Sequence, residues 1–149
     1  MLFRSHAQGL AASGQSMTDW AQKTYGVAGV YANHSGLGGA TRISAGDMVK
    51  TLVRARGTVS GQILPSLLRD VGLRDAKGKE IKDSPVRVRA KSGTLNFVSG
   101  LAGYIQPPKG PELVFVIFAA DTARRDRLKE FEREQPEGGE AWTKRARRL

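Results

Sequence analysis

The chain has 149 residues, the length of one ordinary domain and enough to bury a hydrophobic core. Hydrophobic residues make up 40% and charged residues 26%, which excludes a chain that is disordered throughout. Cysteine is absent, so disulfides, a thiol nucleophile and cysteine zinc sites are excluded, and His6 and His34 are too few for a His-rich metal centre. We therefore expect a single domain over residues 1–149, without a cysteine zinc site or a His-rich metal centre.

Lys and Arg outnumber Asp and Glu by 24 to 14, which gives a formal net charge of +10. This balance favours an anionic partner, although a solvated basic surface without a partner gives the same count. No stretch approaches the roughly 18 apolar residues of a membrane-spanning helix. Residues 1–14 lack the apolar run of a signal peptide. We expect neither a transmembrane segment nor an export signal in this chain.

Capping residues and apolar periodicity predict helices in the first half of the chain. Residues 16–19 (SMTD) have the pattern of a capping box and predict a short helix that ends at Gly26. Residues 44–47 (SAGD) are a second capping box, and the apolar spacing after it predicts a helix that ends at Gly57. Between the two helices, residues 31–43 are rich in Gly, Asn and Ser and predict a loop.

A third helix is predicted to open near Pro65, because apolar residues recur at helical spacing between Ile63 and Val71. Residues 74–85 are charged and turn-like, which predicts a loop. The apolar period then changes to two over residues 86–91, which predicts a half-buried strand. A second strand is predicted over residues 100–106.

Residues 112–120 (ELVFVIFAA) form a continuous apolar run, typical of a strand in the middle of a sheet that is covered on both faces. A charged helix is predicted over residues 123–135 with Leu128 and Phe131 inward. A last helical stretch carries Trp142, Ala146 and Leu149 on one face. Helices followed by about three antiparallel strands and a C-terminal helix predict the α+β fold class.

The tripeptide Lys91-Ser92-Gly93 lies at the end of the first predicted strand. Its ammonium supplies charge, its hydroxyl supplies a hydrogen-bond donor, and its glycine lets a ligand backbone approach without a Cβ in the way. Such a tripeptide is weak evidence alone, and a polar strand edge without a ligand is the alternative. Its position on a predicted strand, followed closely by a partner strand, favours an anion-binding edge.

Residues 89–104 (RAKSGTLNFVSGLAGY) closely resemble a block of the penicillin-binding D-alanyl-D-alanine carboxypeptidases, of the carboxypeptidase/endopeptidase type with inserted domains. Upstream, residues 34–38 (HSGLG) and 42–44 (RIS) resemble that family's Asp-Gly-Ser-Gly-Leu-Ser block, which also precedes a helix. The resemblance covers residues 26–122 best, with 123–149 as a C-terminal helical segment. It implies part of a penicillin-binding/β-lactamase-like transpeptidase fold.

The resemblance also implies roles for individual residues. Lys91, Ser92 and Gly93 match the family's Lys-[Thr/Ser]-Gly motif, so Lys91 and Ser92 are expected to hold the terminal carboxylate of a D-Ala-D-Ala peptide or a β-lactam. The backbone N–H of Thr94 is expected to be one of two oxyanion donors. Asn96 is expected to line the site. The implied reaction is serine acyl transfer on peptidoglycan peptides in the periplasm, without a metal or cofactor.

Two of the family's three motifs are missing or broken. Its nucleophile lies in Ser-x-x-Lys, and no serine of this chain has a lysine three residues later. Its Ser-x-Asn motif should lie near the N-terminus, where Ser5-His6-Ala7 lacks the asparagine. We therefore expect the C-terminal part of such an enzyme, inactive alone, with weak affinity for D-Ala-D-Ala peptides. Its sheet should then have an unprotected edge or an unfilled face. A second copy or a separate N-terminal piece would complete it, or the chain is a gene remnant, and the sequence does not choose among these three.

Two further interpretations remain open. Ser35 follows His34, but adjacency on a loop does not itself make a nucleophile–base pair, and only His6 is left over. The other interpretation is a non-catalytic basic module that binds an anionic polymer such as nucleic acid or a membrane surface. The basic cluster at residues 144–148 favours a solvated helix end over a nucleic-acid surface, because no aromatic residues are interleaved with it for base stacking.

Overall fold

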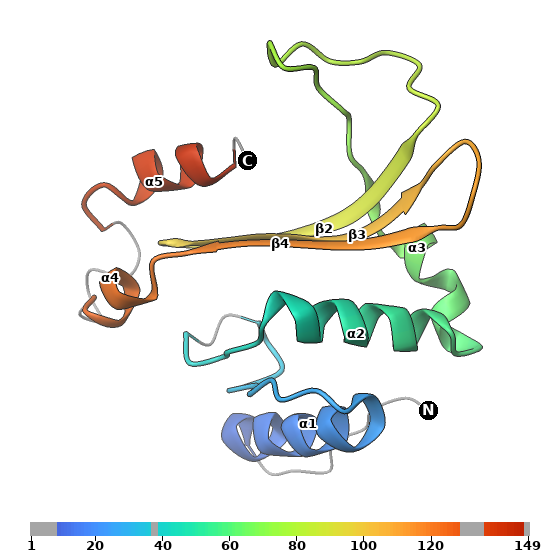
Figure 1. Cartoon of the computed structure of the whole chain (residues 1–149). Coiled ribbons are helices and arrows are strands. Elements are labelled where there is room, and N and C mark those ends of the chain that lie inside the picture. Colours follow the sequence, from blue (N-terminus) through green and yellow to red (C-terminus); the bar gives the residue numbers. More distant parts are fainter. Residues whose placement is uncertain (1–8, 37–38, 129–135, 148–149) are drawn as a thin grey trace. The chain divides into compact units, whose positions relative to one another are not determined.

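The computed structural model of the chain describes residues 9–36, 39–128 and 136–147 (Figure 1). The chain divides into two compact units, Met1–Gln62 and Ile63–Leu149. The first unit contains two long helices, and the second contains an antiparallel sheet with short helices. None of the described helices is long and apolar enough to cross a membrane.

The first helix, α1 (Leu10–Tyr25), begins well before the start that the sequence pattern predicted at residue 16. The Ser16 hydroxyl donates a hydrogen bond to the carbonyl oxygen of Ala12 at 3.0 Å, so it lies inside the helix rather than capping it. The prediction of the start was therefore wrong, whereas the predicted end was correct. Gly26 follows the helix with φ 58°, the left-handed conformation in which glycine is favoured.

The second helix, α2 (Ala45–Arg56), confirms the capping box. The hydroxyl oxygen of Ser44 accepts a hydrogen bond from the backbone N–H of Asp47 at 3.0 Å. The loop before α2 is bonded to α1, since the N–H of Tyr31 donates to Thr18 Oγ1 at 2.9 Å. The first unit is therefore a pair of helices joined by a loop that is hydrogen-bonded to α1.

The third predicted helix is wrong in length. A 3₁₀ turn, η1 (Ser60–Ile63), leads into a single helical turn, α3 (Leu64–Leu67), and the chain then extends as β1 (Arg69–Asp70). The backbone N–H of Val71 donates to the carbonyl of Val88 at 2.8 Å, so Val71 continues the extended chain after β1 and is not helical. The reason is that short apolar runs fit helix and strand equally well.

The sheet of the second unit has four antiparallel strands in the order β1-β2-β3-β4. Figure 1 shows β2, β3 and β4 of this sheet. The three long strands are β2 (Arg87–Leu95), β3 (Val98–Gln106) and β4 (Leu113–Ala120). They confirm the α+β class and the predicted antiparallel strands, and the short β1 is an addition that the sequence did not indicate.

The apolar strand β4 lies at an edge of the described sheet, with β3 as its neighbour. The prediction that it is central was therefore wrong for the described residues. Three of its large side chains, Leu113, Ile117 and Phe118, are 51%, 43% and 41% exposed. An apolar run indicates that both faces of a strand can be buried. It does not indicate whether the chain supplies a neighbouring strand on both edges.

Two helices follow the sheet, α4 (Thr122–Asp126) and α5 (Gly139–Ala146). The helix predicted over residues 123–135 thus ends early in the described part, and Phe131 lies outside the described residues, as does Leu149. Trp142 lies on α5, as predicted. The centre of this unit's core is Phe97, which is fully buried.

Candidate functional site

The tripeptide Lys91-Ser92-Gly93 lies in the second half of β2, where the strand has a free side. The short β1 pairs only with Arg89 and Ala90, so its cover stops just before Lys91. On the other side, β3 pairs with β2 along its whole length. In the described part of the chain, no strand therefore covers the outer side of residues 91–95, which we call the open edge.

The backbone direction of the open edge follows from the ladder. The carbonyl of Val88 accepts from Val71 on the β1 side, so Val88 faces away from β3. Backbone groups alternate in direction along a strand, so Ser92 and Thr94 face the same way as Val88. The N–H and C=O groups of these two residues therefore point out of the sheet at the open edge. An extended ligand could pair with them as an additional strand.

The side chain of Lys91 also reaches the open edge. Its Nζ donates a hydrogen bond to the carbonyl oxygen of Ser92 at 2.5 Å, and the side chain is solvent-exposed. Because that carbonyl points out of the sheet, the ammonium group lies where a ligand on the edge would meet it. The lysine thus places a positive charge beside the outward N–H groups.

The glycine of the tripeptide has no structural reason to be a glycine. A Cβ added at Gly93 would meet no heavy atom within 4 Å. The contrast is Gly103 on β3, where a Cβ would lie 2.0 Å from the carbonyl oxygen of Arg89. Packing within the chain therefore requires glycine at 103 but not at 93, where open space remains for a group from outside.

Thr94 connects the open edge to the C-terminal helix. Its Oγ1 accepts a hydrogen bond from Nη2 of Arg147, just beyond the end of α5, at 3.0 Å. Thr94 and Ser92 are two residues apart on one strand, so their hydroxyls lie on the same face of the sheet. Sequence reasoning missed Arg147, because the contact joins residues 53 positions apart and no local pattern indicates it.

The connection between β2 and β3 is anchored at Phe97. This residue has φ 60°, uncommon for a side chain of this size, and is fully buried. Its carbonyl accepts from the N–H of Asp121 at 2.8 Å, and the Arg124 guanidinium lies 4.3 Å from the ring centroid. The ring also packs edge-on against Trp142 of α5, with centroids 6.0 Å apart. Helices α4 and α5 thus both hold this tip of the hairpin.

Asn96 lies at the same hairpin tip, after the end of the open edge. Its carbonyl oxygen accepts from Nη1 of Arg125 at 2.8 Å. Its side-chain oxygen lies 3.2 Å from the position that a Cβ on Gly139 would take, at the start of α5. The tip therefore brings Asn96 to α5, and its predicted place in a ligand site stays a prediction.

Ser35 and His34, which the sequence left open as a nucleophile–base pair, bond to other residues of the first unit. The Ser35 hydroxyl donates to Oδ1 of Asn33 at 2.8 Å, whereas Nδ1 of His34 lies 3.1 Å from Oγ of Ser13. Ser13 is only 5% exposed, so its hydroxyl is closed to a substrate. The contact therefore fastens the loop to α1 rather than forming an accessible nucleophile. His6 lies outside the described residues.

Metal ligands do not gather at either place. Across residues 9–36, 39–128 and 136–147, no three His, Asp or Glu side chains come close enough together to hold a metal ion. The open edge itself offers two outward N–H groups, the hydroxyls of Ser92 and Thr94, and the cations of Lys91 and Arg147. This set is suited to binding an extended anionic ligand.

The chain matches a known protein family. A sequence model described as the D-Ala-D-Ala carboxypeptidase 3 (S13) family matches residues 5–136, which include the open edge and the hairpin tip but not α5. No curated protein and no solved structure matches the chain significantly.

Proposed function

The chain belongs to the D-Ala-D-Ala carboxypeptidase 3 (S13) family, and from this membership we propose that the open edge of β2 binds the D-Ala-D-Ala end of peptidoglycan peptides. The observation that carries the proposal is the edge itself: residues 91–95 have no strand partner on the outer side in the described part of the chain, and a family motif lies along them. A peptide would add as a strand, with backbone hydrogen bonds to Ser92 and Thr94.

Each residue of the motif then has a role. Lys91 and Ser92 hold the terminal carboxylate, and Gly93 lets the peptide backbone come close. The N–H of Thr94 donates to the oxyanion that develops at the scissile carbonyl. Asn96 lines the end of the site. The outward direction of the Thr94 N–H and the open space beside Gly93 support these roles.

The family's reaction needs a serine that attacks the peptide bond and a water that releases the acyl-enzyme. These 149 residues contain no Ser-x-x-Lys, so we propose that they bind substrate without turning it over. The nucleophile would come from an N-terminal part of the same catalytic domain, acting in the periplasm. The edge strand β4 has exposed apolar side chains, which support a partner strand for the sheet. Either that N-terminal part or a second copy of the chain would supply it.

The test is a titration of the isotope-labelled chain followed by NMR. We expect a peptide that ends in D-Ala-D-Ala to shift the backbone amides of Ser92 and Thr94, with a dissociation constant of about 1 mM or weaker because only part of a pocket is present. The L-Ala-L-Ala peptide should shift them less. Replacing Lys91 with Ala should remove the binding, because it removes the ammonium group that lies on the open edge.

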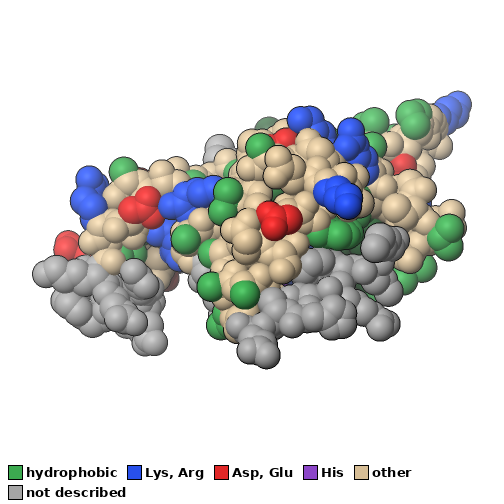
Figure 2. Space-filling view, turned by 90° about the horizontal axis from the view of Figure 1, so that it is seen from below, with side chains coloured by type: hydrophobic (Ala, Val, Ile, Leu, Met, Phe, Trp, Pro, Cys, Tyr) green, Lys and Arg blue, Asp and Glu red, His purple; other side chains and the backbone are tan. Residues whose placement is uncertain are grey.

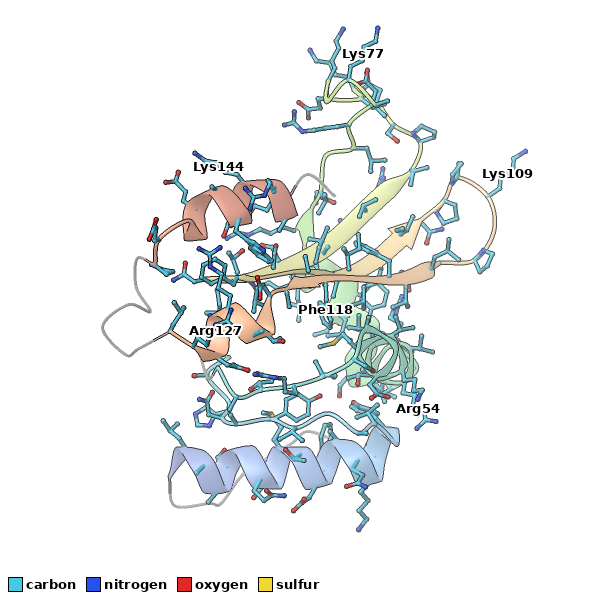
Figure 3. The ribbon with its side chains drawn as sticks, turned by 60° about the vertical axis from the view of Figure 1, so that its left-hand side comes forward. Arg54, Lys77, Lys109, Phe118, Arg127 and Lys144 are labelled. Atoms are coloured by element: carbon cyan, nitrogen blue, oxygen red, sulfur yellow. The ribbon has the colours of Figure 1, made fainter. Side chains whose placement is uncertain are left out.

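The matched control is Lys109→Ala, in the turn between β3 and β4, where Figure 3 shows the side chain directed away from the sheet. It removes the same charge and should leave the titration unchanged. Equal binding by the parent chain and Lys91→Ala would overturn the site assignment.

A basic module that binds an anionic polymer is the competing function, supported by the net charge of +10. On the face that Figure 2 shows, Lys and Arg side chains are interspersed with hydrophobic and other side chains. Binding to nucleic acid or anionic vesicles that weakens steeply with added salt, without any response to D-Ala-D-Ala peptides, would favour this alternative.

A further inference from the structure

We propose that Arg147 is a second cation of the carboxylate subsite, and that it fixes the hydroxyl of Thr94 as a donor toward the terminal carboxylate of the peptide. This inference rests on the proposed function of the open edge and adds to it a residue outside the family match, which ends at residue 136.

The polarity of one hydrogen bond carries the argument. Nη2 of Arg147 lies 3.0 Å from Oγ1 of Thr94. A guanidinium group has only donors, so the threonine oxygen must be the acceptor in this bond. A hydroxyl has a single proton, and that proton is left to donate to another group. Arg147 thus leaves Thr94 as a donor, the form that an incoming carboxylate needs.

The surrounding charges point to the same ligand. The hydroxyls of Thr94 and Ser92 lie on one face of β2. Arg147 donates a hydrogen bond to the hydroxyl of Thr94, and the Lys91 ammonium donates one to the backbone carbonyl of Ser92. Neither cation forms an ion pair with a carboxylate among the described residues. A guanidinium can donate two parallel hydrogen bonds to one carboxylate, and Arg147 uses a single N–H group on Thr94.

The position of Arg147 is set by the fold rather than by its own long side chain alone. Earlier in α5, Trp142 packs its ring on the buried Phe97 at the hairpin tip. The backbone N–H of Arg147 donates to the carbonyl of Thr143 at 3.1 Å, which keeps the residue in helical register. The helix is therefore docked on the same hairpin whose strand carries the open edge.

The test compares two ligands, N-acetyl-D-Ala-D-Ala and its C-terminal amide, titrated into the full chain and followed by NMR. Arg147→Gln should weaken binding of the carboxylate about tenfold while leaving the amide unchanged, since only the carboxylate gains from a charged donor. Arg147→Lys should retain part of the preference, because it keeps the charge but loses the paired donors. Arg145→Gln, which removes the same charge from α5, is the control and should change neither affinity.

A double-mutant cycle separates positioning from general electrostatics. Thr94→Val keeps the backbone N–H and removes the hydroxyl, so it should also reduce the preference for carboxylate over amide. If Arg147 acts through Thr94, the double variant should lose less than the sum of the two single losses. A thermal midpoint for each variant shows whether the fold is kept, and the carboxylate-to-amide ratio is a readout that a purely structural change does not move.

The outcomes distinguish this inference from the function on which it rests. If the parent chain binds neither ligand, the proposed function fails and the role of Arg147 fails with it. If the parent binds the carboxylate in a Lys91-dependent way but Arg147→Gln keeps the full preference, the function stands and the role of Arg147 is overturned. An equal loss in Arg145→Gln also overturns it, because net charge alone would then explain the effect.

Discussion

Two glycines on neighbouring strands show how the same residue type can serve packing or binding. Gly103 is buried, and a methyl group added there would overlap the carbonyl oxygen of Arg89 on β2. Gly93 lies on an exposed part of β2 with open space beside it. Each position predicts a different result for the same substitution.

We expect Gly103→Ala to lower the free energy of unfolding by about 3 kcal/mol or more, because the two strands must separate to admit the methyl group. Gly93→Ala should change that free energy by less than about 1 kcal/mol but weaken binding of the D-Ala-D-Ala peptide. Urea unfolding and the NMR titration measure the two effects. A large loss of stability in Gly93→Ala would contradict the assignment of its open side to a ligand.

At the scale of elements, the first turn of α2 makes stability depend on pH. The hydrogen bond from Lys50, with Nζ 3.2 Å from Oδ1, is the main cause that lowers the pKa of Asp47 below its usual 3.8. A bond from Ser44 acts in the same direction. A carboxyl group whose pKa is lower in the folded state contributes stability above its unfolded pKa and loses it as the pH falls through the folded one.

We therefore expect part of the acid destabilisation, below about pH 4, to disappear in Asp47→Asn. An NMR titration of the Asp47 carboxyl should give a pKa below 3.8 in the parent chain. In Lys50→Met the same pKa should move back up, since the main donor is gone. An Asp47 pKa that Lys50→Met leaves unchanged would show that this lysine is not the cause.

At the scale of the whole molecule, β4 ends the described sheet with three large apolar side chains exposed. Unpaired strand edges with apolar side chains favour association with another chain. We expect the chain to self-associate as its concentration rises, and Ile117→Lys to reduce this association because a charge on an edge strand opposes pairing. Sedimentation velocity over a concentration series measures both.

The control for that prediction is Leu67→Lys on α3 of the same unit, because Leu67 is an apolar residue that is even more exposed, at 69% against 43% for Ile117. It should leave the association unchanged. If both variants reduce association to the same extent, nonspecific contacts between exposed apolar side chains, rather than strand pairing, are responsible.

Local signals in the sequence predicted the elements that local chemistry determines. The Ser44 capping box and the period of two along β2 predict α2 and β2 correctly, because each signal depends on neighbours a few residues away. The edge position of β4 and the bond between Arg147 and Thr94 could not be predicted, since both depend on which distant segments meet. The predicted length of α3 was wrong for another reason. The apolar residues of this segment lie first in a helical turn and then in extended chain, and their spacing does not distinguish the two.

The buried turn at Phe97 has a consequence for how any ligand would bind. Contacts from Asp121, Arg124 and Trp142 order this turn within the chain itself. The backbone that leads from it along β2 is thus fixed by folding, and little chain entropy remains to be lost on association. A bound peptide would lose its own flexibility but would not have to freeze a loop, so even a shallow edge can discriminate between ligands by shape and charge.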